Sequence, residues 1–443
     1  MLANARDTDD IDDTMAVSPI RRLRGELRLP GDKSISHRAA MIASLARGQS
    51  ILENFSTAQD CAATIDCLRA LGVRVAQSES TIIVEGNGIA ELQTPSQTLD
   101  AQNSGTTMRL LAGILAGQPF TTTITGDLSL VTRPMRRVAE PLRMMGAEVE
   151  LDARDCAPLR ITGRRPLHSI NYQTPIASAQ IKSAVLLAAL AAEGITTVAE
   201  PVQTRDHTER LLREFGAQIE WDEKAVSVQG GVELQSRQLV IPGDISSAAF
   251  FIAAAASLPG SDLVIREVGL NPTRTHFLAT LKALGADINV TEERLEAGEP
   301  VGSIHVRGVP LKETTRLDIS GASVSNLIDE LPLLAFLSAS LGCEMTLRDA
   351  GELRVKESDR IAATVANLSS MGAAIDERVD GWRLEAGGKL QGAYLSAFND
   401  HRIAMSCAAA ALSASGTSQI AGARNSVAVS LPEFWRLLET VAE

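Results

Sequence analysis

The segment Leu29–Arg38, with the sequence LPGDKSISHR, returns almost half the chain later as IPGDISSAAF at Ile241–Phe250. Both copies end an apolar stretch with Pro-Gly-Asp and continue with residues that favour a helix. Each copy therefore predicts a strand, a tight turn and a helix. Only the first copy carries Lys33 and Arg38, and the second has apolar residues at those places. One backbone plan is used twice, and only one copy of it is charged.

The copy belongs to a longer internal repeat. Apolar, Ala-rich helices are expected to begin near Ser34, Ser104, Ser178, Ser246, Ser323 and Asp400. Amphipathic helices between them end in a glycine C-cap signal at Gly72, Gly146, Gly216, Gly285 and Gly372. Segments of alternating polarity follow each of these glycines and predict strands. The repeating unit is therefore β-α-β-α-β-β, and it occurs six times.

The apolar helices are predicted to lie inside the protein. Ser178–Ala192 carries a single charge, Lys182, and a helix that is apolar all round is buried on all sides. Strands with one polar face then lie outside the helices, which is the reverse of a doubly wound sheet. We expect an α/β fold of two domains, each with three repeats, with helices buried inside and sheets outside.

The two ends of the chain indicate how the domains connect. The last repeat stops without its final strands, and the segment Ile20–Leu29 is left over at the other end, so we expect this segment to complete the C-terminal domain. The chain would cross between domains at Gly31-Asp32 and again at Gly243-Asp244, which makes a two-stranded hinge. The predicted division is a disordered acidic extension (residues 1–17), a discontinuous domain (18–31 with 244–443) and an inserted domain (32–243), with the site in the cleft.

Composition narrows the class of protein. The chain has 443 residues, 45% of them hydrophobic but only 3% aromatic, and a formal net charge of −12. That charge argues against nucleic acid or an anionic membrane as the main partner. The five scattered cysteines show no metal-binding spacing, and no signal peptide is recognisable. We expect a cytoplasmic monomer with small-molecule ligands and without a metal.

Charged residues cluster where the predicted helices begin. They are Lys33 and Arg38, Arg133, Lys182 beside the polar Gln180, Arg205 before the capping-box pattern Asp206–Glu209, Lys356–Arg360 and Asp400–Arg402. A lone arginine is usually solvated surface, but several at helix N-termini suit phosphate and carboxylate ligands. The sequence therefore predicts that one or more small polyanions bind in the cleft.

One acidic pair stands out among apolar residues. Asp329-Glu330 interrupts a predicted helix at Leu327–Leu341, where a carboxylate is costly unless it is paired or catalytic. An Asp that caps a helix before Pro332 explains the same spacing equally well. The phosphate-binding loop, the dinucleotide fingerprint and the nucleophile elbow are all absent from the sequence.

Six motifs together resemble the 5-enolpyruvylshikimate-3-phosphate (EPSP) synthase family. They are Leu29–Arg38, Asn103–Arg109, Thr132–Met135, Ser178–Ser183, Arg354–Arg360 and Asp400–Met405. The resemblance runs from about Ile20 to the C-terminus and implies the enolpyruvyl transferase fold, two domains of three repeats. It also implies transfer of the enolpyruvyl group of phosphoenolpyruvate to the 5-hydroxyl of shikimate 3-phosphate, with release of phosphate and without a cofactor.

The resemblance assigns roles to fourteen residues. Shikimate 3-phosphate would contact Lys33, Ser34, Arg38, Ser178, Ala179, Gln180, Arg205, Asp329 and Lys356. Phosphoenolpyruvate would contact Lys33, Gly105, Arg133, Gln180, Lys356, Glu357, Arg360 and Arg402. Asp329 would be the base at the 5-hydroxyl. Lys33 and Glu357 would donate or relay the proton to the enol carbon, and the sequence leaves open which residue does which.

Val427–Pro432 lacks a lysine that part of the family carries there, and with Arg205–Glu209 this makes the chain similar to the class II branch.

Two rival functions remain at this point. The sister transferase acting on UDP-N-acetylglucosamine generally uses a loop cysteine as acid, and Cys156 lies in a loop without matching flanks. A non-catalytic hinged binding protein for phosphorylated metabolites would explain the cations but not Asp329 and Glu357 beside them.

Overall fold

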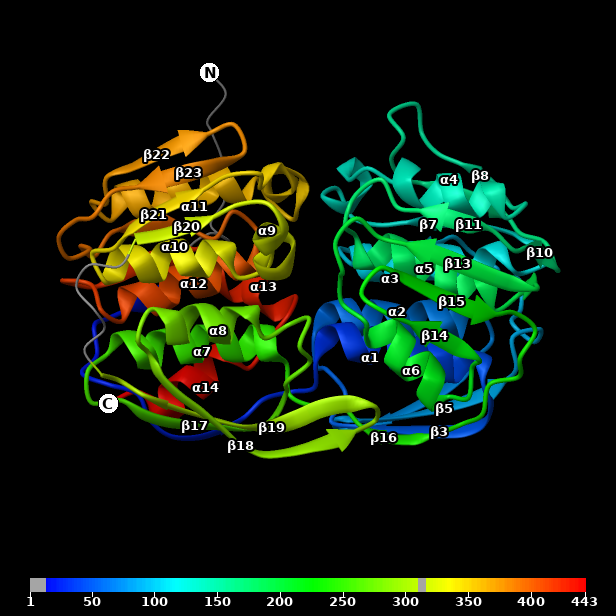
Figure 1. The fold of residues 1–443 in the computed structure, drawn as a ribbon, viewed down its shortest axis with the longest axis horizontal. Coiled ribbons are helices and arrows are strands. Elements are labelled where there is room, and N and C mark those ends of the chain that lie inside the picture. Colours follow the sequence, from blue (N-terminus) through cyan, green and yellow to red (C-terminus); the bar gives the residue numbers. More distant parts are fainter. Residues whose placement is uncertain (1–12, 310–315) are drawn as a thin grey trace, which may run out of the picture.

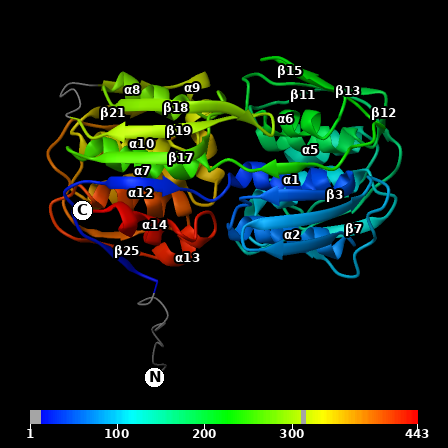
Figure 2. The same ribbon diagram turned by 90° about the horizontal axis from the view of Figure 1, so that it is seen from below.

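The structure is a computed structural model that describes residues 13–309 and 316–443. Two halves lie side by side, each with helices inside and small sheets around them (Figures 1 and 2). Each half has its own apolar core. This arrangement confirms the α/β fold with helices inside. None of the helices in the described ranges is long and apolar enough to span a membrane.

Six apolar helices form the two cores, and five of them begin where the repeat predicts. The prediction is wrong for the other helix, α10, which begins at Leu331 and not near Ser323. The first half contains α1 (Lys33–Leu45), α3 (Gly105–Ala116) and α5 (Ala179–Ala189). The second half contains α7 (Ile245–Ser257), α10 (Leu331–Ser340) and α12 (His401–Ala411). Every residue of α7 from Ile245 to Ala256 is buried, because such a helix has no polar face to offer to solvent.

Amphipathic helices alternate with the apolar ones. They are α2 (Gln59–Ala70), α4 (Arg136–Met144), α6 (His207–Glu214), α8 (His276–Ala283), α11 (Arg360–Ser370) and α14 (Phe434–Val441). Each of the first five ends before its predicted glycine, and all five glycines have φ between 86° and 98°, a region that disfavours other residues. The short helices α9 (Ala322–Leu327) and α13 (Ala423–Ala428) complete the α-helices in the described residues, which also contain 3-10 helices at Leu130–Thr132 and Gly351–Val355.

The sheets follow one plan, in which a parallel pair is extended by two antiparallel strands. In the first half the orders are β16-β3-β5-β4, β6-β7-β9-β8 and β11-β13-β15-β14. Their bounds are β16 (Gln238–Val240), β3 (Arg47–Glu53), β5 (Thr81–Asn87), β4 (Arg74–Ser78), β6 (Leu99–Asp100), β7 (Thr121–Thr125), β9 (Leu159–Thr162), β8 (Glu148–Glu150), β11 (Asn171–Gln173), β13 (Ile195–Ala199), β15 (Ala225–Gln229) and β14 (Ile219–Trp221). A further pair joins β10 (Leu167–His168) to β12 (Ala192–Glu193).

The second half repeats the plan with one shorter sheet. The orders are β2-β17-β19-β18, β20-β21-β23-β22 and β24-β25-β1. Their bounds are β2 (Arg24–Arg28), β17 (Asp262–Gly269), β19 (Glu299–Arg307), β18 (Asp287–Glu296), β20 (Arg316–Ile319), β21 (Glu344–Leu347), β23 (Gly381–Leu384), β22 (Ile375–Arg378), β24 (Tyr394–Ser396), β25 (Ser418–Ala421) and β1 (Met15–Val17).

The two crossings of the chain lie against each other. β2 runs parallel to β17 in the second half, while β16 runs parallel to β3 in the first. Between them Gly31 and Gly243 form an antiparallel bridge, and the Asp32 amide donates to the Pro242 carbonyl at 2.7 Å. A Cβ on Gly31 would lie 1.9 Å from the Asn54 carbonyl oxygen, so only glycine fits. On these contacts, and with β1 paired to β25 in the second half, we propose residues 15–31 with 244–443, and 32–243, as the two domains.

The expected disordered extension is wrong for its last residues. Met15–Val17 forms β1, which pairs antiparallel with Ser418–Ile420 of β25. The last repeat has no final strands of its own, so the N-terminal segment supplies the third strand of that sheet. Asp13 anchors the segment, because its carboxylate accepts from the Asn425 amide at 2.8 Å. Residues 1–12 lie outside the described residues.

The predicted helix at Leu327–Leu341 is two helices. α9 ends at Leu327 and α10 begins at Leu331, so Asp329 and Glu330 occupy the break between them. Glu330 stands at the N-cap of α10 without a side-chain cap bond. The alternative in which Asp329 merely caps the following helix therefore fails, because both carboxylates are directed to partners outside α10.

Candidate active site

A cavity of about 270 Å³ lies between the two halves. Its lining includes all fourteen residues that the resemblance assigned. The first half contributes the starts of α1, α3 and α5 and the loops before α4 and α6. The second half contributes the break between α9 and α10 and the loops before α11 and α12. Residues spread over almost the whole chain therefore meet at one place.

Several helices begin at this cavity, and polar side chains cap them. Asp32 accepts from the Ile35 amide at 2.9 Å, Ser104 from the Thr107 amide at 3.1 Å, and Asp400 from the Arg402 amide at 2.9 Å. Each of these caps satisfies only some of the first-turn amides of its helix. Convergent helix N-termini stabilise negative charge, and the lining arginines add to that effect.

The arginines of the first half are fixed by hydrogen bonds. Arg38 is buried and donates to Thr208 Oγ1, the Ser34 carbonyl and Ser183 Oγ at 2.8, 2.9 and 3.0 Å. Arg109 donates to Gln180 Oε1 at 2.8 Å. Lys33 pairs with Asp60 at 3.0 Å. Such side chains present charge in a set geometry and lose little freedom when an anion binds.

Asp329 lies among four arginines. Its carboxylate contacts Arg205 directly and lies 3.4 Å from both Arg274 and Arg402. Arg360 approaches the other carboxylate oxygen at 3.6 Å. Arg205 belongs to the first half, so this contact also joins the two halves across the cavity.

Glu357 is held as a carboxylate. Burial alone would raise its pKa, but the charges of Arg360 and Arg133, with that of Lys33, hold the pKa well below its usual range. Arg360 Nη2 donates to it at 2.6 Å, and Arg133 lies 3.5 Å away in the opposite half. An anion that draws these arginines toward itself will raise the proton affinity of Glu357.

Sequence reasoning missed several lining residues, of which Arg274 is the most important. Arg274 is buried, donates to Ser246 Oγ and faces Asp329. It lies in the loop just before α8, so the signal that marked the other arginines was present here too. Asp60, Arg109, Glu330 and His401 also line the cavity and were not assigned.

The capping box predicted at Asp206–Glu209 is wrong. Asp206 occupies the N-cap of α6 but makes no cap bond, and its carboxylate instead accepts from Arg210 at 2.9 Å and Asn271 at 2.6 Å. Glu209 pairs with the buried Lys182 at 2.7 Å. Lys182 therefore does not reach the cavity, and these tertiary ion pairs replace the local cap.

The match to known proteins spans nearly the whole chain. The family model for EPSP synthase (3-phosphoshikimate 1-carboxyvinyltransferase) matches residues 17–438. The chain belongs to the EPSP synthase family. It is 48% identical over 430 residues to the 3-phosphoshikimate 1-carboxyvinyltransferase of Geobacter sulfurreducens, covering 97% of this chain and 99% of that protein. Over 431 residues it is 49% identical to the enzyme of Desulforudis audaxviator, covering 97% and 99%.

A solved structure shares the fold of the EPSP synthase family with this chain. The EPSP synthase of Acinetobacter baumannii superposes with a TM-score of 0.86 at 40% identity, and the match covers 97% of this chain and 98% of that one. Each of the six sequence segments that carry the resemblance contributes residues to the lining of the cavity.

We expect Lys356, which lines the cavity, to make anion binding depend on pH. Burial, with the nearby charge of Arg360, lowers its pKa to about 8, so Lys356 loses its positive charge as the pH rises through that value. We expect the affinity for shikimate 3-phosphate to fall above about pH 8, because the unliganded pKa governs the binding profile. K356R should abolish the fall, while K389R, at an exposed lysine, should leave it unchanged. Equilibrium binding measured against pH tests this, and an identical profile in K356R would contradict it.

Proposed function

We propose that the cavity catalyses the reaction of the family. The chain is a 3-phosphoshikimate 1-carboxyvinyltransferase of the shikimate pathway to aromatic amino acids. It transfers the enolpyruvyl group of phosphoenolpyruvate to the 5-hydroxyl of shikimate 3-phosphate and releases phosphate. The observation that carries the assignment is that the family's motifs, from both halves, converge on one cationic cavity.

Shikimate 3-phosphate is proposed to bind mainly against the first half. Arg38, Arg205 and the start of α5 at Ser178 suit its phosphate, since each combines positive charge or helix N-terminal amides with hydroxyl donors. Ser34, Ala179, Gln180, Lys33 and Lys356 complete that subsite. Its 5-hydroxyl would then lie toward Asp329 in the opposite half.

Phosphoenolpyruvate is proposed to bind between Arg133 of the first half and Arg360 and Arg402 of the second, with Lys33, Gln180, Lys356 and Glu357 around it. Gly105 supports this placement. A Cβ there would approach Arg109 Nη1 at 2.6 Å and Arg133 Nη1 at 3.4 Å, so glycine keeps the start of α3 open to an anion.

The chemistry requires an acid and a base on different sides of the reacting carbon. We assign Asp329 as the base that takes the proton of the 5-hydroxyl as its oxygen attacks C2 of phosphoenolpyruvate, while C3 gains a proton. Release of phosphate then breaks the C2–O bond, and C3 loses a proton to restore the double bond. Glu357 suits both the gain and the loss of a proton at C3. A bound phosphate would attract the arginines that keep Glu357 ionised, and its affinity for a proton would then rise. Lys33, which also lines the cavity, is the alternative donor.

Anion binding is proposed to exchange partners across the cleft. The pairs Arg205–Asp329, Arg133–Glu357 and Arg137–Glu352 all join opposite halves. Substrate phosphates and carboxylates compete for the first two pairs and free Asp329 and Glu357 for proton transfer. Closure around the two substrates excludes water and strengthens each remaining contact.

We also assign the chain to the class II branch, as Arg205 in the cavity and the lack of a lysine in Val427–Pro432 support. The cysteines do not support the sister reaction on UDP-N-acetylglucosamine, which generally uses a cysteine as the acid. All five cysteines lie in the described residues, and none lines the cavity. Cys156 is buried, with its Sγ 3.4 Å from the Thr132 carbonyl oxygen.

The deciding assay is phosphate release from phosphoenolpyruvate in the purified protein. Release is expected only when shikimate 3-phosphate is present, and UDP-N-acetylglucosamine should not replace it. Release with the nucleotide sugar alone would favour the sister transferase. Binding of both phosphorylated compounds without any phosphate release would favour a non-catalytic binding protein.

A further inference from the structure

A further contact between the halves is made by the hairpin of β18 and β19. The hairpin of β18 and β19 belongs to the second half, yet its tip reaches the first half next to α6 in both views (Figures 1 and 2). Ala297, which lies in the turn of the hairpin, packs against the core of the first half. Arg210 on α6 donates from Nη1 to the Gly298 carbonyl at 2.9 Å. The tip of the hairpin is therefore docked on α6.

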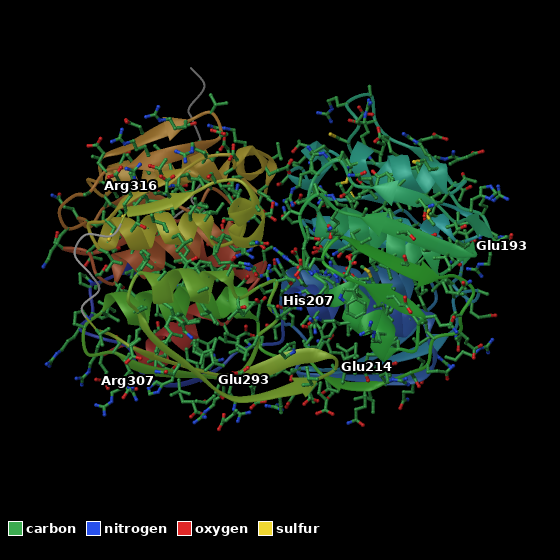
Figure 3. All side chains as sticks on the ribbon, in the orientation of Figure 1. Glu193, His207, Glu214, Glu293, Arg307 and Arg316 are labelled. Carbon is green, nitrogen blue, oxygen red and sulfur yellow. The ribbon has the colours of Figure 1, made fainter. Side chains whose placement is uncertain are left out.

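A buried polar network accompanies this contact. Glu299, the first residue of β19, is 1% exposed and accepts from His207 Nδ1 at 2.7 Å and from Asn271 Nδ2 at 2.8 Å. Asn271 Nδ2 also donates to Asp206 Oδ1 at 2.6 Å. His207 lies on the side of its half that faces the other half (Figure 3). One amide group thus bridges two carboxylates from opposite halves.

The hydrogen bonds of this network that link Asp206 and His207 to the second half form only when the two halves are in contact. A carboxylate at an N-cap ordinarily bonds the amides of its own helix, but Asp206 gives that bond up for Asn271 and Arg210. Buried charge is costly unless its partners are correctly placed. The network therefore tolerates only one arrangement of α6 against the second half.

Both ends of the network are attached to arginines of the cavity. Arg205 directly precedes Asp206 in the chain. Asn271 Oδ1 accepts from the Thr273 amide at 2.9 Å and from Thr273 Oγ1 at 2.7 Å, and Arg274 follows Thr273. Arg205 and Arg274 both contact Asp329. Fixing the network consequently fixes these two arginines relative to each other.

We propose that Asn271, Glu299 and His207 are positioning residues that hold Arg205 and Arg274 across the cleft and thereby set the affinity for shikimate 3-phosphate. This inference rests on the proposed role of Arg205 in binding that substrate. It adds to the reaction a set of residues that touch neither substrate.

N271D tests the proposal without changing the shape of the side chain. The variant keeps the oxygen that Thr273 bonds but replaces the bridging amide by a third carboxylate, which repels Asp206 and Glu299. We expect the Kd for shikimate 3-phosphate, measured by calorimetry, to rise at least about ten-fold. E296Q, on the same hairpin but outside the network, is the matched control and should bind as the unaltered protein does. An unchanged Kd in N271D would overturn the proposal.

Two further arms separate positioning from loss of folding. In an Arg205→Gln background N271D should weaken binding less than about two-fold, because its effect is transmitted through Arg205. In N271D/E299Q the amide of residue 299 can donate to the carboxylate of residue 271, so the bond between the two positions is restored in the opposite direction. This double variant should recover most of the affinity. Equal losses with and without Arg205, or no recovery, would overturn the proposal. If circular dichroism shows that N271D does not fold, N271A, which removes the bridging amide without adding a charge, replaces it in the comparison with and without Arg205. Turnover by the unaltered protein tests the function separately.

Discussion

D329N is expected to bind shikimate 3-phosphate with a Kd within about three-fold of the unaltered value, yet to turn over roughly 1,000 times more slowly. The amide has nearly the shape of the carboxylate but cannot accept the proton of the 5-hydroxyl. Binding should persist because Asp329 competes with the substrate for Arg205 and Arg402, so the loss of its charge leaves those arginines more available to an anion.

E330Q is the matched control for D329N. Glu330 is the neighbouring carboxylate, buried among the same cations, with Arg402 at 3.6 Å and Arg274 at 3.9 Å. It accepts from Ser246 Oγ at 2.5 Å and has no assigned role in proton transfer. Removal of either charge should affect anion binding similarly, whereas kcat should collapse only in D329N. Calorimetry gives the Kd and phosphate release gives kcat. If D329N retained more than about a tenth of the activity, Asp329 could not be the base.

The repeat pattern predicted the core and the position of the cavity, because both depend on local signals. Apolar helices show their burial in their own composition, and the glycine after each amphipathic helix marks its end. The charged turns occupy the same point of each repeat, at the start of a helix. Because the repeats pack in the same way, these turns lie at the same end of each half and meet there. This is why all fourteen assigned residues line one cavity.

Partners chosen by the tertiary structure could not be predicted. Asp206 has a capping-box sequence, but Asn271, far along the chain, takes its carboxylate. Met15–Val17 follows an acidic, polar segment, yet it forms a strand because the sheet of β24 and β25 has no further strand from the last repeat and pairs with it. Asp329 stands in a helical pattern that breaks because four arginines, one of them from the other half, bind its carboxylate. In each case a contact distant in sequence outweighs the local preference.

R360M is expected to remove about 3–5 kcal/mol from the free energy of unfolding and to abolish phosphoenolpyruvate binding. Arg360 is 1% exposed and donates from Nε to Asp400 at 2.7 Å and from Nη2 to Glu357 at 2.6 Å. Burial opposes its charge, but Asp400 and Glu357 more than offset this and raise the pKa of Arg360. Without the guanidinium, the fully buried Asp400 carboxylate has lost its main counter-charge.

The stability and binding effects of R360M can be separated with a second substitution. Asp400 caps α12 by accepting from the Arg402 amide at 2.9 Å, and asparagine keeps that cap while removing the uncompensated charge. R360M/D400N should therefore regain most of the unfolding free energy, measured in urea, while phosphoenolpyruvate binding stays absent. R383M, at an exposed and loosely paired arginine, should change neither quantity. If the double variant recovered binding along with stability, Arg360 would be a structural residue only, and the anion would have to be held by Arg133 and Arg402.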